Sequence, residues 1–293
     1  MRHVTINQDL CIRCGRCVAD CPMGIPCTDE NGDYCSREEH AEVCIYCGHC
    51  VAVCPVGAVT LNPMEDKEQL ELLEDYGIVP FGLSQEECRP SEMEKLPCSA
   101  QLEALIRSRR MTRSFKSELV SKSVVEHMVK DVLAYAPSGH NSRGYEAVVV
   151  EGREKLEELT VLSLEYFDRL IQEGGLHEFD VKVFQRMIQA WKEGKDRVFR
   201  TAPEAIIIHC NTSIVPADPA VKVMLTYFEI LANGMGLGTV WAGYFMVAAN
   251  YPPMKEMLGI PENHTVYGAM MFGYPEFVYE YIPKRPEISL RFM

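Results

Sequence analysis

The stretch CIRCGRCVADCP at residues 11–22 recurs, with the same cysteine spacing, as CIYCGHCVAVCP at residues 44–55. Each copy places three cysteines two residues apart, a fourth cysteine after three further residues, and then a proline. Three cysteines so spaced can wrap a loop around one face of a cubic iron–sulfur cluster, while the fourth points away from it. Two zinc sites are the alternative, but they would use paired C-x2-C hairpins and leave the repeated triplets unexplained. The repeat therefore indicates iron–sulfur ligation.

This double pattern resembles the bacterial two-cluster ferredoxins, and the resemblance covers residues 1–63. It implies two 4Fe–4S clusters, each completed by the outward-pointing cysteine of the other motif. The first cluster would be held by Cys11, Cys14, Cys17 and Cys54. The second would be held by Cys44, Cys47, Cys50 and Cys21. We expect the flanking segments Val4–Ile6 and Ala58–Leu61 to pair as strands that close this small domain.

The segment between the two motifs holds two further cysteines, Cys27 and Cys35. Between them, residues 29–33 read DENGD, with the glycine too early for a calcium-binding loop, so we predict an Asn-Gly turn. Three interpretations of the two cysteines stay open: small buried side chains, a redox pair, or a third metal site. Cys88, Cys98 and Cys210 stand alone in the sequence, and we expect them to serve packing.

The whole chain of 293 residues has a formal net charge of −13, from 29 basic and 42 acidic residues. This acidic balance argues against nucleic acid or an anionic membrane surface as the main partner. No apolar run approaches the length of a membrane span, and the N-terminal residues lack the apolar core of a signal peptide. We therefore expect a cytoplasmic protein, in which clustered cysteines favour metal ligation over disulfides.

Charge and proline content divide the chain into three parts. Residues 1–63 form the cysteine-rich domain, residues 64–100 an acidic connector with four prolines, and residues 101–293 a nearly charge-balanced body. In the connector we predict one helix over about Met64–Tyr76, with Asn62 as its N-cap and Gly77 as its end.

The body shows the mixed patterns of an α+β fold. We predict helices at Ser99–Arg107, Ser123–Tyr135 (with a capping box from Ser123 and Glu126), Arg153–Gly174, Val181–Gly194 and Ala217–Asn233. We predict strands at Tyr145–Glu151, Ala205–His209 and Thr265–Phe272, followed by an extended, proline-containing arm over Tyr274–Met293.

Four short motifs in the body carry a second resemblance. They are RRMTRSF at 109–115, APSGHNS at 136–142, GYP at 273–275 and PKRP at 283–286. In this order and spacing they resemble the nitroreductase family of FMN flavoproteins, over about residues 100–286. The resemblance implies an FMN-binding α/β sandwich, with the ferredoxin-like domain attached at its N-terminus. It also implies a homodimer with FMN at the subunit interface.

The same resemblance implies which residues bind the flavin. They are Arg109, Arg110, Met111, Arg113, Pro137, Ser138, Asn141, Ala242, Gly243, Lys284 and Arg285. The FMN phosphate is a dianion and needs fixed cations, a role that fits Arg109, Lys284 and Arg285. Arg113 matches the basic residue beside flavin N1 and O2, where negative charge develops on reduction.

Two further segments would face the flavin ring. The amide of Asn141 can both donate and accept, as the pyrimidine edge of the ring requires. The segment 240–244, with Ala242 and Gly243, matches the stretch whose backbone N–H faces flavin N5. The chain departs from the family where Asn141 is followed by Ser142 and Arg143, so Arg143 faces an anionic substrate, the cluster domain or solvent.

These features predict an iron–sulfur flavoprotein oxidoreductase. Electrons would enter the clusters from a low-potential donor protein, pass to FMN and leave to a small-molecule acceptor. NAD(P)H is the alternative donor and would reduce the flavin directly. The acceptor could be a nitroaromatic, a quinone, an activated C=C bond or a carbon–halogen bond. Two alternatives are an electron-transfer subunit that relays between proteins, and a flavin or thiol redox sensor that uses Cys27 and Cys35.

Overall fold

The computed structural model describes residues 3–37, 43–88 and 95–293, and these residues form two compact units. Unit 1 contains Met1–Leu96, Pro137–Glu146 and Cys210–Ala220, and unit 2 contains Pro97–Ala136, Ala147–His209 and Val221–Met293. Parts of the predicted ferredoxin domain (residues 1–2 and 38–42) and of the predicted connector (89–94) lie outside the described residues. The domain boundaries after residues 63 and 100 stay a prediction.

The cysteine-rich part of unit 1 is closed by two short antiparallel strands, β1 (Val4–Ile6) and β4 (Val59–Leu61). The predicted pairing is confirmed, with Val4 opposite Leu61. Each cysteine motif continues into one helical turn or slightly more, α1 (Arg16–Asp20) and α2 (His49–Ala52). Valines, an isoleucine and a leucine from these elements form a small buried core.

The segment between the motifs folds as a β-hairpin, which the sequence pattern did not predict. Strand β2 (Pro26–Thr28) pairs antiparallel with β3 (Tyr34–Ser36), and Cys27 lies opposite Cys35. The predicted Asn-Gly turn joins the two strands: the Asp29 N–H donates to the Asp33 carbonyl at 2.9 Å, and Gly32 has a φ of 82°. Three-residue strands are too short for alternation to be visible in the sequence.

The predicted connector helix begins later than expected. Helix α3 spans Lys67–Asp75, because the Asn62 N–H donates to the His3 carbonyl at 2.6 Å and so extends the β1–β4 pairing. Asn62 therefore cannot be the N-cap that we predicted. The predicted end is confirmed: the Gly77 N–H donates to the Glu74 carbonyl at 2.8 Å, and Gly77 has a φ of 65°. A 3₁₀ turn, η2 (Gln85–Glu87), follows.

Unit 1 also includes two segments from the second half of the chain. The Arg143 N–H donates to the Gly77 carbonyl at 2.6 Å. A Cβ atom on Gly144 would lie 2.7 Å from Cδ1 of Ile214, and one on Gly77 would lie 2.9 Å from the same atom. Glycine is therefore the residue that fits at positions 77 and 144 beside Ile214.

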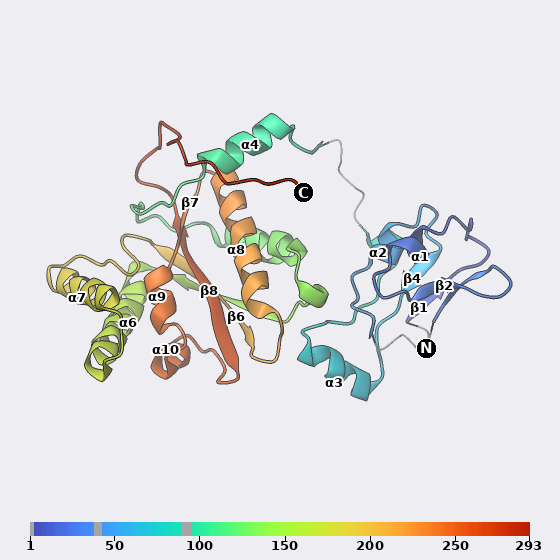
Figure 1. Ribbon diagram of the computed structural model, residues 1–293, viewed down its shortest axis with the longest axis horizontal. Helices are drawn as coiled ribbons and strands as arrows, with labels where there is room; N and C mark the ends of the chain where they lie inside the picture. The colour runs from blue at the N-terminus through green and yellow to red at the C-terminus, as the bar shows by residue number, and fades with distance from the viewer. Residues whose placement is uncertain (1–2, 38–42, 89–94) are drawn as a thin grey trace. The chain divides into compact units, whose positions relative to one another are not determined.

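The second fold element is a four-stranded sheet with the order β5-β6-β8-β7 (Figure 1). Its strands are β5 (Tyr145–Glu151), β6 (Glu204–Asn211), β7 (Gly238–Trp241) and β8 (His264–Gly273). Strand β7 runs antiparallel to β8, with Thr239 opposite Phe272. The three predicted strands are confirmed, whereas the short β7 was not predicted.

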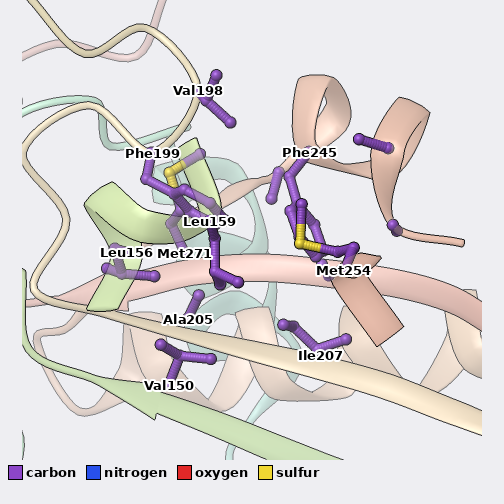
Figure 2. Close-up of a cluster of buried hydrophobic side chains, with 14 of the residues drawn as sticks. Val150, Leu156, Leu159, Val198, Phe199, Ala205, Ile207, Phe245, Met254 and Met271 are labelled. Carbon is purple, nitrogen blue, oxygen red and sulfur yellow. The ribbon is translucent and has the colours of Figure 1, made fainter. Parts of the chain in front are cut away.

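Helices pack on both faces of this sheet. On one face, helix α8 (Ala217–Gly234) places Phe228 edge-on to Phe272, with ring centroids 5.3 Å apart. On the other face, α6 (Arg153–Glu173) and α9 (Gly243–Ala248) share a buried core with Met271 (Figure 2). Successive strand residues point to opposite faces, so β8 serves both layers. The arrangement is the predicted α/β sandwich.

The remaining helices of unit 2 are α4 (Ser99–Ser108), α5 (Lys122–Glu126), a π segment η4 (His127–Val132), the 3₁₀ turn η5 (Leu133–Tyr135), α7 (Glu178–Lys192) and α10 (Pro252–Met257). The 3₁₀ turn η6 (Gly139–Asn141) belongs to unit 1. Stacking of Phe167 on Phe184, with centroids 4.4 Å apart, joins α6 to α7.

The ends of the predicted helices differ in detail. Ser99, which we expected to cap its helix, is the first residue of α4, and Cys98 is the N-cap, with its N–H donating to the Gln101 side-chain oxygen at 3.1 Å. The helix predicted from Val181 begins three residues earlier, at Glu178 of α7. The cap of α5 is Ser121 rather than Ser123, since the Ser121 carbonyl accepts the first helical hydrogen bonds. Serine-rich segments offer several caps, and the tertiary contacts select one.

Beyond β8, residues 276–293 form no helix or strand, as predicted for an extended arm. Among the described residues, no helix is both long enough and apolar enough to span a bilayer.

Candidate functional site

Two of the predicted ligands of the first cluster, Cys11 and Cys54, lie close to a third, Cys17. Burial raises the pKa of the Cys17 thiol, and the nearby thiols of Cys54 and Cys11 add to this effect. Cys54 belongs to the second motif, so the structure brings it beside cysteines of the first motif. Cys14, the fourth predicted ligand of this group, is exposed.

The second group gathers Cys21 with the triplet of the other motif. Burial raises the pKa of Cys44 to about 11, and Cys47 and Cys21 add to this effect. Burial also raises the pKa of Cys50 to about 12, with contributions from Cys44, Cys47 and Cys21. The four residues line one cavity in unit 1. Such clustered thiols favour a metal centre, because thiolates in a low-dielectric site need a positive partner.

The two motifs share one backbone conformation. Arg13 and Tyr46, each just before the middle cysteine, have φ values of 54° and 50°. Gly15 and Gly48, each just after it, have φ values of 73° and 72°. These left-handed residues curl each triplet into a tight loop.

The fourth cysteine of each motif accepts a backbone hydrogen bond in the same way. The Ile25 N–H donates to Sγ of Cys21 at 3.4 Å, and the Ala58 N–H donates to Sγ of Cys54 at 3.3 Å. Hydrogen bonds to sulfur are one of the means by which proteins set cluster potentials. The donor set, its pairing and its symmetry fit two four-iron clusters.

Three of the predicted flavin residues, Pro137, Ser138 and Asn141, belong to unit 1. The Asn141 amide donates to the carbonyls of Ile45 and Tyr46 at 3.0 and 3.2 Å. Its own oxygen accepts from Arg143 at 2.6 Å. In this structure, Asn141 therefore binds the backbone of the second cysteine loop, a contact that sequence reasoning missed.

Other predicted flavin residues line a cavity of about 630 Å³ in unit 2. Met111 and Arg113 contribute from the segment after α4, and Gly243 contributes from the start of α9. Trp241 and Tyr244 flank Gly243 in the same wall. Ala242 is fully buried behind it and donates its N–H to the Ala269 carbonyl at 3.0 Å. Helices α6 and α7 contribute mainly apolar side chains to the lining, together with one carboxylate, Asp180.

Sequence reasoning missed a second cation in this cavity, Arg200. Burial lowers the pKa of Arg200, and the neighbouring guanidinium groups of Arg113 and Arg197 lower it further. Arg200 also adopts a φ of 59°, unusual for a residue with a side chain. Two of these cations, Arg113 and Arg200, line the cavity, and neighbouring like charges favour an anion there. No motif marks residues 197–200, so only the fold could reveal this group.

A neighbouring cavity of about 270 Å³ contains Arg109 and Arg110. Arg109 donates to the nearly buried Glu229 at 2.9 Å. Arg110 donates to the Arg107 and Arg109 carbonyls, and its buried Nε has no hydrogen-bond partner among the described residues. Lys284 and Arg285 are exposed in the arm and line neither cavity.

Comparison with known proteins identifies both regions. Residues 106–274 match the model of the nitroreductase family, and residues 10–59 match that of the 4Fe-4S dicluster domain. A putative NADH dehydrogenase/NAD(P)H nitroreductase of Archaeoglobus fulgidus is 24% identical over 177 residues, which are 59% of this chain and 84% of the relative. An iodotyrosine deiodinase of Daphnia pulex is 25% identical over 232 residues, covering 74% of this chain and 72% of the relative.

Two solved structures share the fold. A nitroreductase with bound FMN from Desulfitobacterium hafniense has a TM-score of 0.52 at 21% identity. The match covers 65% of this chain and 98% of the chain in that structure. One from Bacteroides fragilis, also with bound FMN, has a TM-score of 0.54 at 20% identity, with the same coverage. The predicted resemblances are thus confirmed, and the cofactor set inferred from the sequence agrees with the matches. The chain belongs to the nitroreductase family and carries a 4Fe-4S dicluster domain before its nitroreductase domain.

Proposed function

We propose that this protein is an FMN-dependent oxidoreductase in which the dicluster domain collects single electrons and FMN delivers them in pairs to a small acceptor. FMN supplies the one-electron to two-electron conversion when it is bound. The observation that carries the proposal is the cavity of about 630 Å³ in unit 2, which Arg113 and Arg200 line together with Gly243. The predicted contacts to FMN stay part of this proposal.

The charges of this cavity suit a ring that becomes negative on reduction. Arg113 and Arg197 both lie close enough to Arg200 to act on it electrostatically, and Arg113 and Arg200 line the cavity together with the mainly apolar side chains of α6 and α7. Preorganised cations in a dry site stabilise a developing negative charge more strongly than water does. The same cations would bind an acceptor that carries a carboxylate or nitro group.

Arg109 and Arg110 are suited to a different part of the cofactor. They line the second cavity of unit 2, and the unpartnered Nε of Arg110 is buried there. A guanidinium group that lacks one hydrogen bond can donate to a phosphate oxygen. We assign this cavity to the FMN phosphate.

The eight clustered cysteines support electron entry through the dicluster domain. Residues 1–63 and 64–100 both carry an excess of acidic side chains, so a basic face on a donor protein would dock there. NAD(P)H is the alternative donor, in line with the names of the archaeal relatives. The name of the Daphnia pulex relative, an iodotyrosine deiodinase, supports a carbon–halogen bond among the possible acceptors. We further propose a homodimer, as the family resemblance implies.

The decisive test removes one ligand from each triplet. The double variant Cys14→Ser with Cys47→Ser should lose turnover driven by a reduced ferredoxin-type protein. After chemical reduction of its flavin, the same variant should still reduce a nitroaromatic acceptor in stopped flow. The matched control is Cys88→Ser with Cys98→Ser, which removes two cysteines outside both motifs and should keep donor-driven turnover. If donor-driven turnover survives loss of both clusters, electrons reach the flavin by another route and the proposal is wrong.

A further inference from the structure

Cys27 and Cys35 lie outside both ligand groups and face each other across the β2–β3 hairpin. They are directly opposite in the antiparallel register, and their Sγ atoms are 2.7 Å apart. Opposite residues of such a pair have Cα atoms about 4.5–5.5 Å apart, within the 4.4–6.8 Å that a disulfide spans. The two thiols therefore need no backbone movement to become bonded.

The two thiols differ in accessibility. Cys27 is buried, whereas Cys35 is only half-buried. The hydrogen bond to Cys27 is the main cause that raises the pKa of Cys35 to about 11. Cys35 is therefore mainly a protonated thiol at neutral pH, and it is the sulfur that a small reagent would reach first.

The hairpin is connected to the second cysteine group through Ile25. The Ile25 N–H donates to Sγ of Cys21, and its carbonyl accepts the Arg37 N–H at 2.9 Å. Ile25 and Pro26 also line the cavity formed by Cys21 and the second triplet. The residue that closes the hairpin is therefore also one that contacts a predicted cluster ligand.

The other strand of the hairpin contacts the first cysteine loop. Arg13 forms an ion pair with Asp33, and the Tyr34 hydroxyl donates to the Arg13 carbonyl at 3.5 Å. A Cβ on Gly15 would lie 3.1 Å from the same hydroxyl oxygen. A bond between the two strands would therefore restrain segments that touch both loops.

We propose that Cys27 and Cys35 are a reversible dithiol–disulfide site that reacts with low-molecular-weight disulfides. The Cys35 thiol first loses its proton to solvent; its thiolate sulfur then attacks one sulfur of the small disulfide and releases one small thiolate, which takes up a proton. The Cys27 sulfur then displaces the second small thiol, so that the Cys27–Cys35 bond forms. Each cysteine loses one proton and one electron, and the small disulfide takes up these two protons and two electrons to become two small thiols. This site does not depend on the proposed function.

The test uses the intact, anaerobically purified holoprotein in buffers of graded glutathione to glutathione-disulfide ratio. Free thiols are alkylated at each ratio, and the protein is cleaved after glutamate. Glu30 lies between the two cysteines, so a Cys27–Cys35 bond joins peptide 1–30 to peptide 31–38, and fragmentation of the linked pair shows that the bond is at Cys27 and not at another cysteine of peptide 1–30. We expect this linked species to rise and fall reversibly with the ratio, at constant iron content.

Variants make the result specific. Cys27→Ser should leave Cys35 as a stable mixed disulfide with glutathione, whereas Cys35→Ser should react far less at the buried Cys27. Cys88→Ser is the matched control and should keep the full transition. The proposal is overturned if both cysteines are alkylated at every ratio, or if Cys35 pairs with a ligand cysteine. Protection of both thiols that a zinc chelator relieves would overturn it in favour of a metal site.

Discussion

Replacing Arg109 should weaken FMN binding through the phosphate alone. Arg109 lines the smaller cavity of unit 2 and donates to Glu229, with side chains 30% and 8% exposed. We predict that Arg109→Ala weakens FMN binding but leaves riboflavin binding unchanged, because riboflavin has the same ring and lacks the phosphate. Glu229→Gln keeps the hydrogen-bond acceptor but removes a negative charge that competes with the phosphate, so it should tighten FMN binding.

The size of both effects follows from the geometry. A hydrogen bond to a charged group contributes about 1.5–3 kcal/mol, which corresponds to roughly 10- to 150-fold in the dissociation constant. Because Arg109 is 30% exposed, solvent screening places the loss toward the lower end, at about tenfold. The gain for Glu229→Gln should be smaller, at about 1 kcal/mol or roughly fivefold.

Isothermal titration of flavin-free protein with FMN and with riboflavin measures both constants. Arg109→Ala also leaves the nearly buried Glu229 carboxylate unpaired, which destabilises the fold. The double variant Arg109→Ala with Glu229→Gln is therefore the control: it should regain stability and still bind FMN weakly. Equal weakening of FMN and riboflavin by Arg109→Ala would refute the assignment of the phosphate to this cavity, as would weaker FMN binding by Glu229→Gln.

Four further outcomes follow from the structure. Arg113→Ala should lower the flavin reduction potential more than it weakens FMN binding, since charge develops near its site only on reduction; redox titration with a parallel binding titration would show this. Cys21→Ser should damage the cluster held by Cys44, Cys47 and Cys50, and Cys54→Ser should damage the cluster held by Cys11, Cys14 and Cys17. Electron paramagnetic resonance of the two clusters measures this, and loss of the cluster in the motif that carries the substitution would contradict the predicted ligand sets. Burial raises the pKa of Glu204 above its ordinary value of 4.5, so the folded state holds a proton that the unfolded state loses above about pH 4.5. The free energy of unfolding of the wild type should therefore fall as the pH rises above about 4.5, by at most about 1.4 kcal/mol per pH unit. Glu204→Gln should lack this slope in urea titrations followed by tryptophan fluorescence. Deletion of Lys284–Met293 should lose both FMN and the dimer, and a flavin-loaded monomer in sedimentation would contradict the role given to the arm.

The sequence was most informative where a pattern repeats or where an element is long. The paired cysteine motifs predicted which thiols gather, and the β-branched run of β5 predicted its bounds at Tyr145 and Glu151. Helix starts were less predictable, because several residues near Ser99 and Ser121 can cap and the tertiary contacts decide between them. Arg200 and the contact from Asn141 to the second cysteine loop were not predictable, since both depend on segments that are distant in the sequence.

The close packing of Gly77 and Gly144 on Ile214 has an evolutionary consequence. The three residues come from the end of α3 and from the two late segments of unit 1, so each limits the size of the others. A larger side chain at position 77 or 144 would therefore require a smaller one at position 214. Positions 144 and 214 both lie within residues 106–274, so we expect this limit also in family members that lack the N-terminal region. Joint variation of positions 77 and 214, by contrast, is expected only in chains that carry both regions.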